Sequence, residues 1–487
     1  MKKFSSILLF SLAITLQCQP SDFTSRLHET YDTYREGSLN HRRIKHQDLQ
    51  PLIDRVESLQ GFKVRTVGTS IEGRKLRLIS LGTGETDIFL WSQMHGNEPT
   101  ATQAIFDILN FMASADFAKE KSEILEAVTI HFLPMLNPDG AEVFQRRNTL
   151  GIDINRDALR LQSPEGRTLK RVRDSLEADF GFNLHDQSTY YNAERTPKPA
   201  TISYLAPAYN YEKEVNQVRA NAMKVIVYMN RIIQKYAPGQ VGKYNDDFEP
   251  RAFGDNIQKW GTSLILIESG GYPDDVEKQQ IRKLNYVSIL SAIYSIATRE
   301  FEEIPLQDYI DIPENDRKLF DLKIERITYP LLGSDYVIDL GIQRPEVDLE
   351  DHTAFWNSSR IIDVGDLSTF YGYETLNGNG FRVKAAEVYP ETVENLEAVS
   401  RMDAWDLLAD GYAYIRVRDL PADLVSSPFA LHLISETYKL TPERLEVGAN
   451  PTFFLGKGTS LEYAVINGFL YHLPSKKGKG RNSMIYR

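Results

Sequence analysis

His95 and Glu98 stand three positions apart in the segment HGNE and offer two metal-binding side chains, an imidazole and a carboxylate. The segment follows the apolar run Ile88–Met94, which is typical of a buried strand, and precedes Thr102–Ala113, whose apolar residues share one helical face. On a turn from a strand into a helix, the two side chains can reach one zinc ion together. A histidine at a strand end is also common as a structural residue, so this segment alone leaves both interpretations open.

Three further polar residues follow other predicted strands. Asn137 comes after one apolar run, His185 ends a second and Glu268 ends a third. In sheets whose strands alternate with helices, ligands bind at the carboxyl ends of the strands, so we expect these residues to lie near His95. Glu268 could instead be a salt-bridge partner, but a carboxylate that ends the apolar run Leu264–Ile267 carries a desolvation cost that favours a function.

Four short motifs accompany HGNE in chain order. They are NPDG at 137–140, GIDINR at 151–156, NLH ending at His185 and ILIE ending at Glu268. With these motifs, residues 60–275 resemble the zinc carboxypeptidase family of the carboxypeptidase A type. The resemblance implies a metal-dependent hydrolase with that family's α/β fold, here an exported bacterial member.

The resemblance also implies a ligand set and a base. His95, Glu98 and His185 would hold one zinc ion per chain. Asp153 would accept the second ring proton of His95 and fix its tautomer, although it could also simply cap a turn. Glu268 would be the general base that activates the zinc-bound water.

Substrate contacts follow from the same resemblance. Asn155 and Arg156 would bind the terminal carboxylate of the substrate, a task that suits a planar guanidinium. Either Arg146 or Arg147 would stabilise the oxyanion that forms on the carbonyl. Arg147 could instead be a solvated surface charge.

Some positions depart from the family pattern or align with it only approximately. Asp186 follows His185 where pancreatic-type members carry a serine. Tyr244 is the candidate for the family's mobile substrate-binding tyrosine, from its approximate distance to Glu268. Asp255 would select basic side chains if it lines the specificity pocket.

The elements that position these residues alternate between strand and helix up to about residue 300. This order predicts a mostly parallel or mixed sheet with helices on both faces, and a catalytic domain over residues 23–300. The acidic segment 301–316 contains two prolines and is interpreted as a linker. Short alternating runs after it predict a β-rich accessory domain over residues 317–487. Parts of residues 448–468 resemble the small β-domain of amidohydrolases, but a packing or dimerisation module is the simpler interpretation.

The first 22 residues differ from the rest. Lys2 and Lys3 precede the short apolar run Phe4–Leu16, a pattern typical of a secretory signal and too short for a membrane helix. The alternative is a buried N-terminal helix. Cys18 stands where lipoproteins carry their lipidated cysteine, although Gln17 is a poor match there, and cleavage without lipidation is the alternative. We expect an exported protein, periplasmic or anchored as a lipoprotein.

Composition limits the other classes of function. The net charge of -11 and the pI near 5.5 give no basic field that would gather nucleic acid. A single cysteine excludes an internal disulfide framework and any cysteine-rich metal site.

The leading hypothesis is therefore zinc-dependent hydrolysis of an amide bond next to a free C-terminal carboxylate, in a peptide or a peptidoglycan stem. One alternative is a deacylase or amidase that acts on small N-acyl amino acids. Another is a catalytically silent protein that binds peptide or glycan ends. Such a protein would have lost a ligand or the base, and here all four residues are present.

Overall fold

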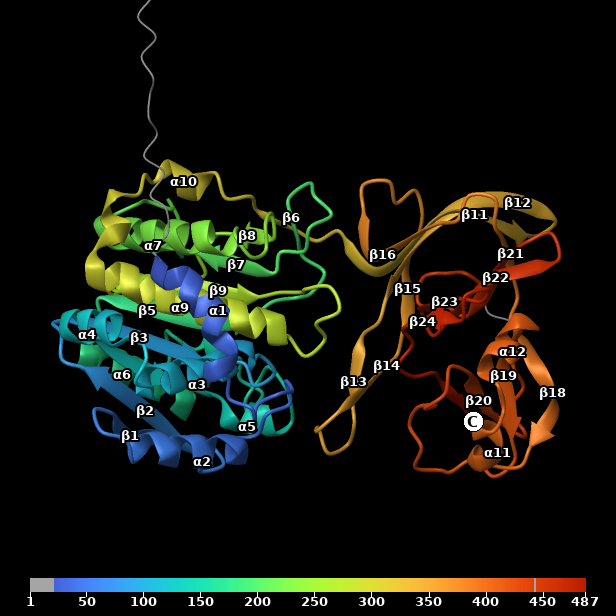
Figure 1. The fold of residues 1–487 in the computed structure, drawn as a ribbon, viewed down its shortest axis with the longest axis horizontal. Helices are drawn as coiled ribbons and strands as arrows, with labels where there is room; N and C mark the ends of the chain where they lie inside the picture. The colour runs from blue at the N-terminus through green and yellow to red at the C-terminus, as the bar shows by residue number, and fades with distance from the viewer. Residues whose placement is uncertain (1–21, 442–443) are drawn as a thin grey trace, which may run out of the picture.

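The computed structural model describes residues 22–441 and 444–487, which form two lobes (Figure 1). Helices cover a sheet in the first lobe, and strands make up most of the second. Cys18 and the rest of the predicted signal up to residue 21 lie outside the described residues. Within the described ranges, none of the helices combines the length and the apolar character needed to cross a membrane.

The sheet of the first lobe is mixed. Strands β4, β3, β5 and β9 run parallel to one another, and antiparallel strands flank them on both sides. This arrangement confirms the predicted α/β fold. In their order across the sheet, the strands are β1 (Lys63–Thr69), β2 (Lys75–Gly82), β4 (Val128–Leu133), β3 (Thr86–Ser92), β5 (Phe180–Asp186), β9 (Ser263–Ser269), β7 (Ile202–Leu205) and β8 (Val241–Lys243).

Helices pack on both faces of this sheet. One face is covered by α1 (Asp22–Tyr34), α2 (His46–Glu57), α3 (Thr100–Ala113), α4 (Ala118–Ala127), α7 (Gln217–Ile233) and α9 (Gln279–Thr298). The other face is covered by α6 (Pro164–Leu176) and α8 (Phe253–Lys259). Local sequence sets where these helices begin: Ser163 and Asn216 each accept a hydrogen bond from a backbone N–H in the first turn of α6 and α7.

Strand β3 shows why the sequences of the central strands are mostly apolar. Ile88, Phe89, Leu90 and Trp91 are all fully buried. Alternate residues point to opposite faces, so Ile88 and Leu90 join the core under one helical layer, and Phe89 and Trp91 join the core under the other. The middle of the strand is therefore apolar on both faces, and the strand ends three residues before His95.

Residues 301–316, predicted as a linker, pack onto the first lobe. They form η2 (Glu300–Glu303), α10 (Gln307–Ile310) and the short strand β10 (Asn315–Asp316), which pairs with β6 (Asn192–Ala193). Four buried side chains from this segment belong to the core of the first lobe, namely Phe301, Ile304, Tyr309 and Ile312. The chain thus reaches the second lobe only after pairing with a loop of the first.

The second lobe is β-rich, as predicted. Its larger sheet has the strand order β15 (Arg360–Gly365), β12 (Ser334–Gln343), β11 (Leu319–Leu331), β17 (Arg382–Lys384), β21 (Phe453–Lys457), β22 (Ser460–Ile466), β23 (Phe469–His472) and β24 (Lys477–Gly478). Strand β16 (Tyr371–Asn377) pairs with β11 in parallel. A smaller sheet contains β18 (Glu387–Val393), β19 (Tyr412–Val417), β20 (His432–Ser435) and β25 (Ile485–Tyr486), accompanied by α11 (Leu396–Ser400) and α12 (Ala404–Ala409).

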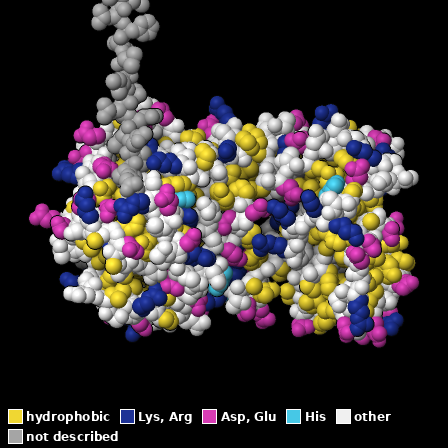
Figure 2. All heavy atoms as spheres, in the orientation of Figure 1, with side chains coloured by type: hydrophobic (Ala, Val, Ile, Leu, Met, Phe, Trp, Pro, Cys, Tyr) yellow, Lys and Arg dark blue, Asp and Glu magenta, His cyan; other side chains and the backbone are white. Residues whose placement is uncertain are grey.

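The hairpin of β13 (Glu346–Asp348) and β14 (Phe355–Asn357) reaches from the second lobe to the first. There, Arg43 pairs with Asp348 and Glu346, and its guanidinium lies 4.3 Å from the rings of both Phe144 and Phe355. Figure 2 shows acidic and basic side chains interspersed over this face of both lobes.

Candidate active site

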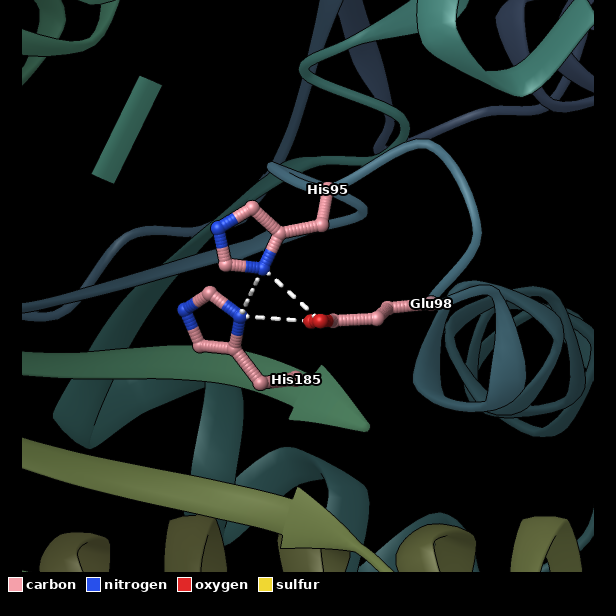
Figure 3. A group of neighbouring side chains, drawn as sticks. All are labelled: His95, Glu98 and His185. Atoms are coloured by element: carbon pink, nitrogen blue, oxygen red, sulfur yellow. Dashed lines mark hydrogen bonds and ion pairs between the residues drawn. The ribbon is translucent and has the colours of Figure 1, made fainter. Parts of the chain in front are cut away.

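His95, Glu98 and His185 converge on one point at the carboxyl ends of β3 and β5 (Figure 3). Glu98 Oε1 lies 2.8 Å from His95 Nδ1, and Glu98 Oε2 lies 2.7 Å from His185 Nδ1. The two Nδ1 atoms are 3.1 Å apart. His95 and Glu98 lie on one turn and His185 comes from a distant strand, and each of the three side chains is less than a tenth exposed.

This donor set fits a zinc ion. The three ligand atoms lie within 4.8 Å of one another, and the two Nδ1 atoms face each other at 3.1 Å beside the Glu98 carboxylate. Two imidazoles and one carboxylate are a common protein ligand set of catalytic zinc, which keeps a further position open. The structure thus brings together the three ligands that the sequence predicted.

Asp153 holds the far side of the His95 ring. Its Oδ1 lies 3.1 Å from His95 Nε2 and also accepts a hydrogen bond from the backbone N–H of Asn155, at the start of η1 (Ile154–Arg156). The carboxylate thus caps the turn and contacts the histidine ring, and both interpretations drawn from the sequence are consistent with its position.

The titration of these groups reflects their burial and their neighbours. Burial opposes protonation of His95, but the carboxylates of Glu98 and Asp153 outweigh it and raise the pKa of the imidazole. Burial would raise the pKa of Glu98, yet the two facing imidazoles hold it well below its usual range. The carboxylate of Glu98 is therefore ionised, as a metal ligand must be.

Arg146 lies in this cluster, and Arg147 does not. Arg146 NH1 is 3.1 Å from His95 Nδ1 and 3.4 Å from Glu98 Oε1, and its Nε donates to Asp153 at 3.0 Å. The side chain of Arg147 is exposed and donates to the carbonyl of Gly151 at 2.9 Å. Of the two candidates for the oxyanion position, the geometry selects Arg146.

The NPDG motif shapes the turn that carries His95. Asn137 Oδ1 accepts from the backbone N–H of Gly140 and begins the short helix α5 (Pro138–Glu142). The backbone N–H of Asn137 donates to the carbonyl of Gln93, two residues before His95. Gly96 lies directly on Gly140, since a Cβ on Gly96 would be 2.0 Å from the carbonyl carbon of Gly140. The motif therefore supports the ligands without being one of them.

Glu268 is paired in register with His185, because β9 lies beside β5. Burial raises the pKa of its carboxyl well above the usual value, and the nearby carboxylates of Glu98 and Asp186 raise it further. A carboxylate with a raised pKa beside the metal ligands is suited to accept a proton at neutral pH.

These residues line one cavity of about 530 Å³. The predicted residues on its wall are His95, Glu98, Arg146, Asn155, Arg156, His185, Tyr244, Asp255 and Glu268. Asn155 also ties η1 to α8, because its Oδ1 accepts from the backbone N–H of Phe253 at 3.0 Å. Arg156 is partly exposed, with its Nε 3.6 Å from Glu249.

The structure adds residues to which the sequence assigned no role. Asp186 lines the cavity and is held by Thr100 Oγ1 at 2.6 Å and by Lys278 Nζ at 3.0 Å. Tyr191 lines the same cavity and packs its ring against Tyr244. The departure at Asp186 was visible in the sequence, but no local pattern pointed to Lys278 or Tyr191.

Comparison with known proteins finds similarities confined to the first lobe. Residues 53–260 match the family described as zinc carboxypeptidase. A probable carboxypeptidase 2 from Trichophyton verrucosum is 30% identical over 159 residues, which cover 30% of this chain and 30% of that protein. Carboxypeptidase E from Caenorhabditis elegans is 31% identical over 112 residues, covering 19% and 24% of the two chains.

A solved metallo-carboxypeptidase from Burkholderia cenocepacia is 18% identical, aligned over 52% of this chain and 69% of that chain with a TM-score of 0.43. The chain spans less than a third of the length of the two curated relatives above. The family match over residues 53–260 ends before Glu268. It includes His95, Glu98 and His185 and the turns that support them. Residues 53–260, less than half of the chain, thus match the zinc carboxypeptidase family.

Proposed function

We propose that the protein is a zinc-dependent carboxypeptidase, which hydrolyses the amide bond next to a free C-terminal carboxylate in a peptide or a peptidoglycan stem. One observation carries this proposal: the ligand set, Glu268, Arg146 and Arg156 all line the same cavity. The family of residues 53–260 supports the reaction type. The choice of a substrate with a free carboxylate rests on Arg156.

Each residue then has a distinct task. A zinc ion held by His95, Glu98 and His185 would supply Lewis-acid activation of water and of the substrate carbonyl. Arg146 donates to the carbonyl oxygen as negative charge develops there. Glu268 takes a proton from the attacking water and passes it to the leaving nitrogen.

Arg156 binds the chain end through paired N–H donors, which match the two oxygens of a carboxylate. Its guanidinium donates one hydrogen bond, from NH1 to the carbonyl of Asn155 at 2.8 Å, and its Nε lies 3.6 Å from Glu249. We propose that its other N–H donors bind an incoming carboxylate. An amidated chain end would offer one oxygen and a competing donor in place of two acceptors.

A pair of peptides identical except for a free or amidated C-terminus tests this function. Wild type is expected to cleave the free peptide, and Arg156→Ala is expected to reduce the ratio of kcat/KM for free over amidated peptide by roughly 10- to 100-fold, the range for a lost charged hydrogen bond. Arg147→Ala, an exposed arginine outside the cavity, is the matched control. Equal cleavage of both peptides by wild type would reject the proposal, and cleavage of N-acyl amino acids alone would favour a deacylase.

The acidic lining supports a preference for basic C-terminal residues. Asp255 lines the cavity near Arg156, and its Oδ1 accepts from the backbone N–H of Glu249 at 2.9 Å. Burial raises the pKa of this carboxyl to about 6, with Arg156 opposing the rise and Glu249 adding to it. The carboxylate is therefore charged above pH 6 and neutral below it, so it can attract a cation only in the higher range.

Wild type is expected to prefer lysine-ended over leucine-ended peptides by about tenfold at pH 8, a typical value for one partly buried charge pair. This preference should fall as pH drops through about 6. Asp255→Asn should lower the preference and remove its pH dependence. The measurement is the ratio of kcat/KM for the two peptides between pH 5 and 8. The same ratio in wild type and Asp255→Asn at every pH would show that Asp255 does not recognise the C-terminal side chain of the substrate.

A further inference from the structure

Two tyrosines form one wall of the cavity. Tyr191 lies on the loop after β5 and Tyr244 follows β8, and their rings pack edge to face with centroids 5.9 Å apart. Burial raises the pKa of the Tyr244 hydroxyl, and the carboxylate of Glu268 and a hydrogen bond with Tyr191 raise it further. The wall is therefore formed by two loops that follow different strands. Its shape depends on the contacts that hold these two loops together.

The backbone segment leading into the second lobe contacts both loops. The carbonyl of Pro313 accepts from the backbone N–H of Lys243, the residue before Tyr244, at 2.7 Å. On the other side, Asn315 pairs with Ala193 in the β10–β6 ladder, two residues after Tyr191. A single stretch of extended chain thus lies between the two halves of the wall.

Two side chains of the second lobe contact the Tyr191 loop as well. Tyr190 donates its hydroxyl to Asp321 Oδ2 on β11 at 2.8 Å. Tyr373 on β16 donates its hydroxyl to the carbonyl of Thr189 at 2.5 Å. In Figure 1 this edge of the second lobe is the part that faces β6.

Tyr373 reaches a second loop of the active site. A Cβ on Gly271 would lie 2.0 Å from the Tyr373 hydroxyl oxygen, so the hydroxyl fits into space that only a glycine leaves open. Gly271 lies three residues after Glu268, and Thr189 lies four residues after His185. One hydroxyl from the second lobe therefore lies between the loops that follow the base and the third metal ligand.

We propose that the second lobe positions the tyrosine wall, with Tyr373 and the Tyr190–Asp321 pair as its positioning residues. This inference rests on the proposed function in one respect, because the wall borders the cavity that we assign to the substrate. The second lobe is then part of the catalytic unit rather than a separate packing or dimerisation module. Substrate binding depends on it, whereas proton transfer by Glu268 does not.

The test compares Tyr373→Phe and Tyr190→Phe in the full-length protein, since each substitution removes one hydroxyl and leaves the ring. Tyr336→Phe is the matched control, because Tyr336 is on the same sheet and half exposed, near the β11–β12 turn. Hydrogen exchange of residues 187–194 is measured by mass spectrometry, with strand β2 as an internal reference. KM and kcat are measured with the free-ended peptide.

Each of the two variants is expected to exchange about threefold to tenfold faster over residues 187–194, the range for one lost hydrogen bond, with β2 unchanged. KM should rise by a similar factor while kcat stays within twofold. Tyr336→Phe should match wild type in all three measurements.

Unchanged exchange over residues 187–194 in both variants would overturn the proposal. Faster exchange with an unchanged KM would also overturn it, since the loop would then be anchored without serving binding. If wild type cleaves no peptide, the proposed function fails by itself, and the exchange data alone decide whether the second lobe fixes the wall.

Discussion

Glu268→Gln is expected to lower kcat for the free-ended peptide by roughly 10²- to 10⁴-fold, the usual contribution of a general base. Glutamine keeps the shape of the side chain but cannot accept the proton of the attacking water. Because Glu268 lies beside His185 without belonging to the ligand cluster, KM should change little. Steady-state kinetics over a range of concentrations of one peptide measure both constants.

Measuring the zinc content distinguishes a variant that has lost only the general base from one that has lost the metal site. Glu268→Gln and wild type should both hold about one zinc per chain by metal analysis, since the variant's ligands are intact. His95→Ala should lose the metal, because it removes one of three converging donors. A Glu268→Gln protein that holds zinc and turns over within tenfold of wild type would rule out Glu268 as the base.

Arg146→Met is expected to lower kcat by about 10²- to 10³-fold, the effect of removing one donor from an oxyanion site. Methionine keeps most of the length of the side chain and removes every N–H donor. Arg147→Met is the matched control: it makes the same change one residue along the chain, where the guanidinium donates to the carbonyl of Gly151 and lies outside the cavity. The control should stay within twofold of wild type.

Arg146 also donates to Asp153, so the variant could act indirectly through His95. Zinc analysis distinguishes the two routes. A variant that retains zinc and loses turnover supports a direct role at the carbonyl. Equal losses in Arg146→Met and Arg147→Met would contradict the assignment of Arg146.

The ligand set and its support could be proposed from sequence because they fall in short motifs that carry the resemblance to zinc carboxypeptidases. Glu98 follows His95 on one turn, and Asp153 lies two residues before Asn155 on another. Such turns are short, and the apolar strands before them end close to the functional residues. The sheet then brings the strand ends together, since parallel strands finish at a common edge.

The contacts between distant segments could not be predicted in the same way. Asp186 and Lys278 are 92 residues apart, and Thr189 and Tyr373 are 184 residues apart. No periodicity links such pairs, so only the folded chain shows them. The segment predicted as a linker from its prolines and acidic residues makes long-range contacts of the same kind, since its apolar side chains, such as Phe301 and Tyr309, pack into the core of the first lobe.

The contact between Gly96 and Gly140 limits how this centre could be transplanted into another scaffold. Copying His95, Glu98 and His185 alone would reproduce the donor atoms but not the two backbone turns that touch behind them. Any other residue in place of Gly96 puts a Cβ 2.0 Å from the facing backbone, and the turn that holds two of the three donors must then shift. A protein designer would therefore have to graft both glycine turns as one unit, because the contact between their backbones sets the spacing of the donors.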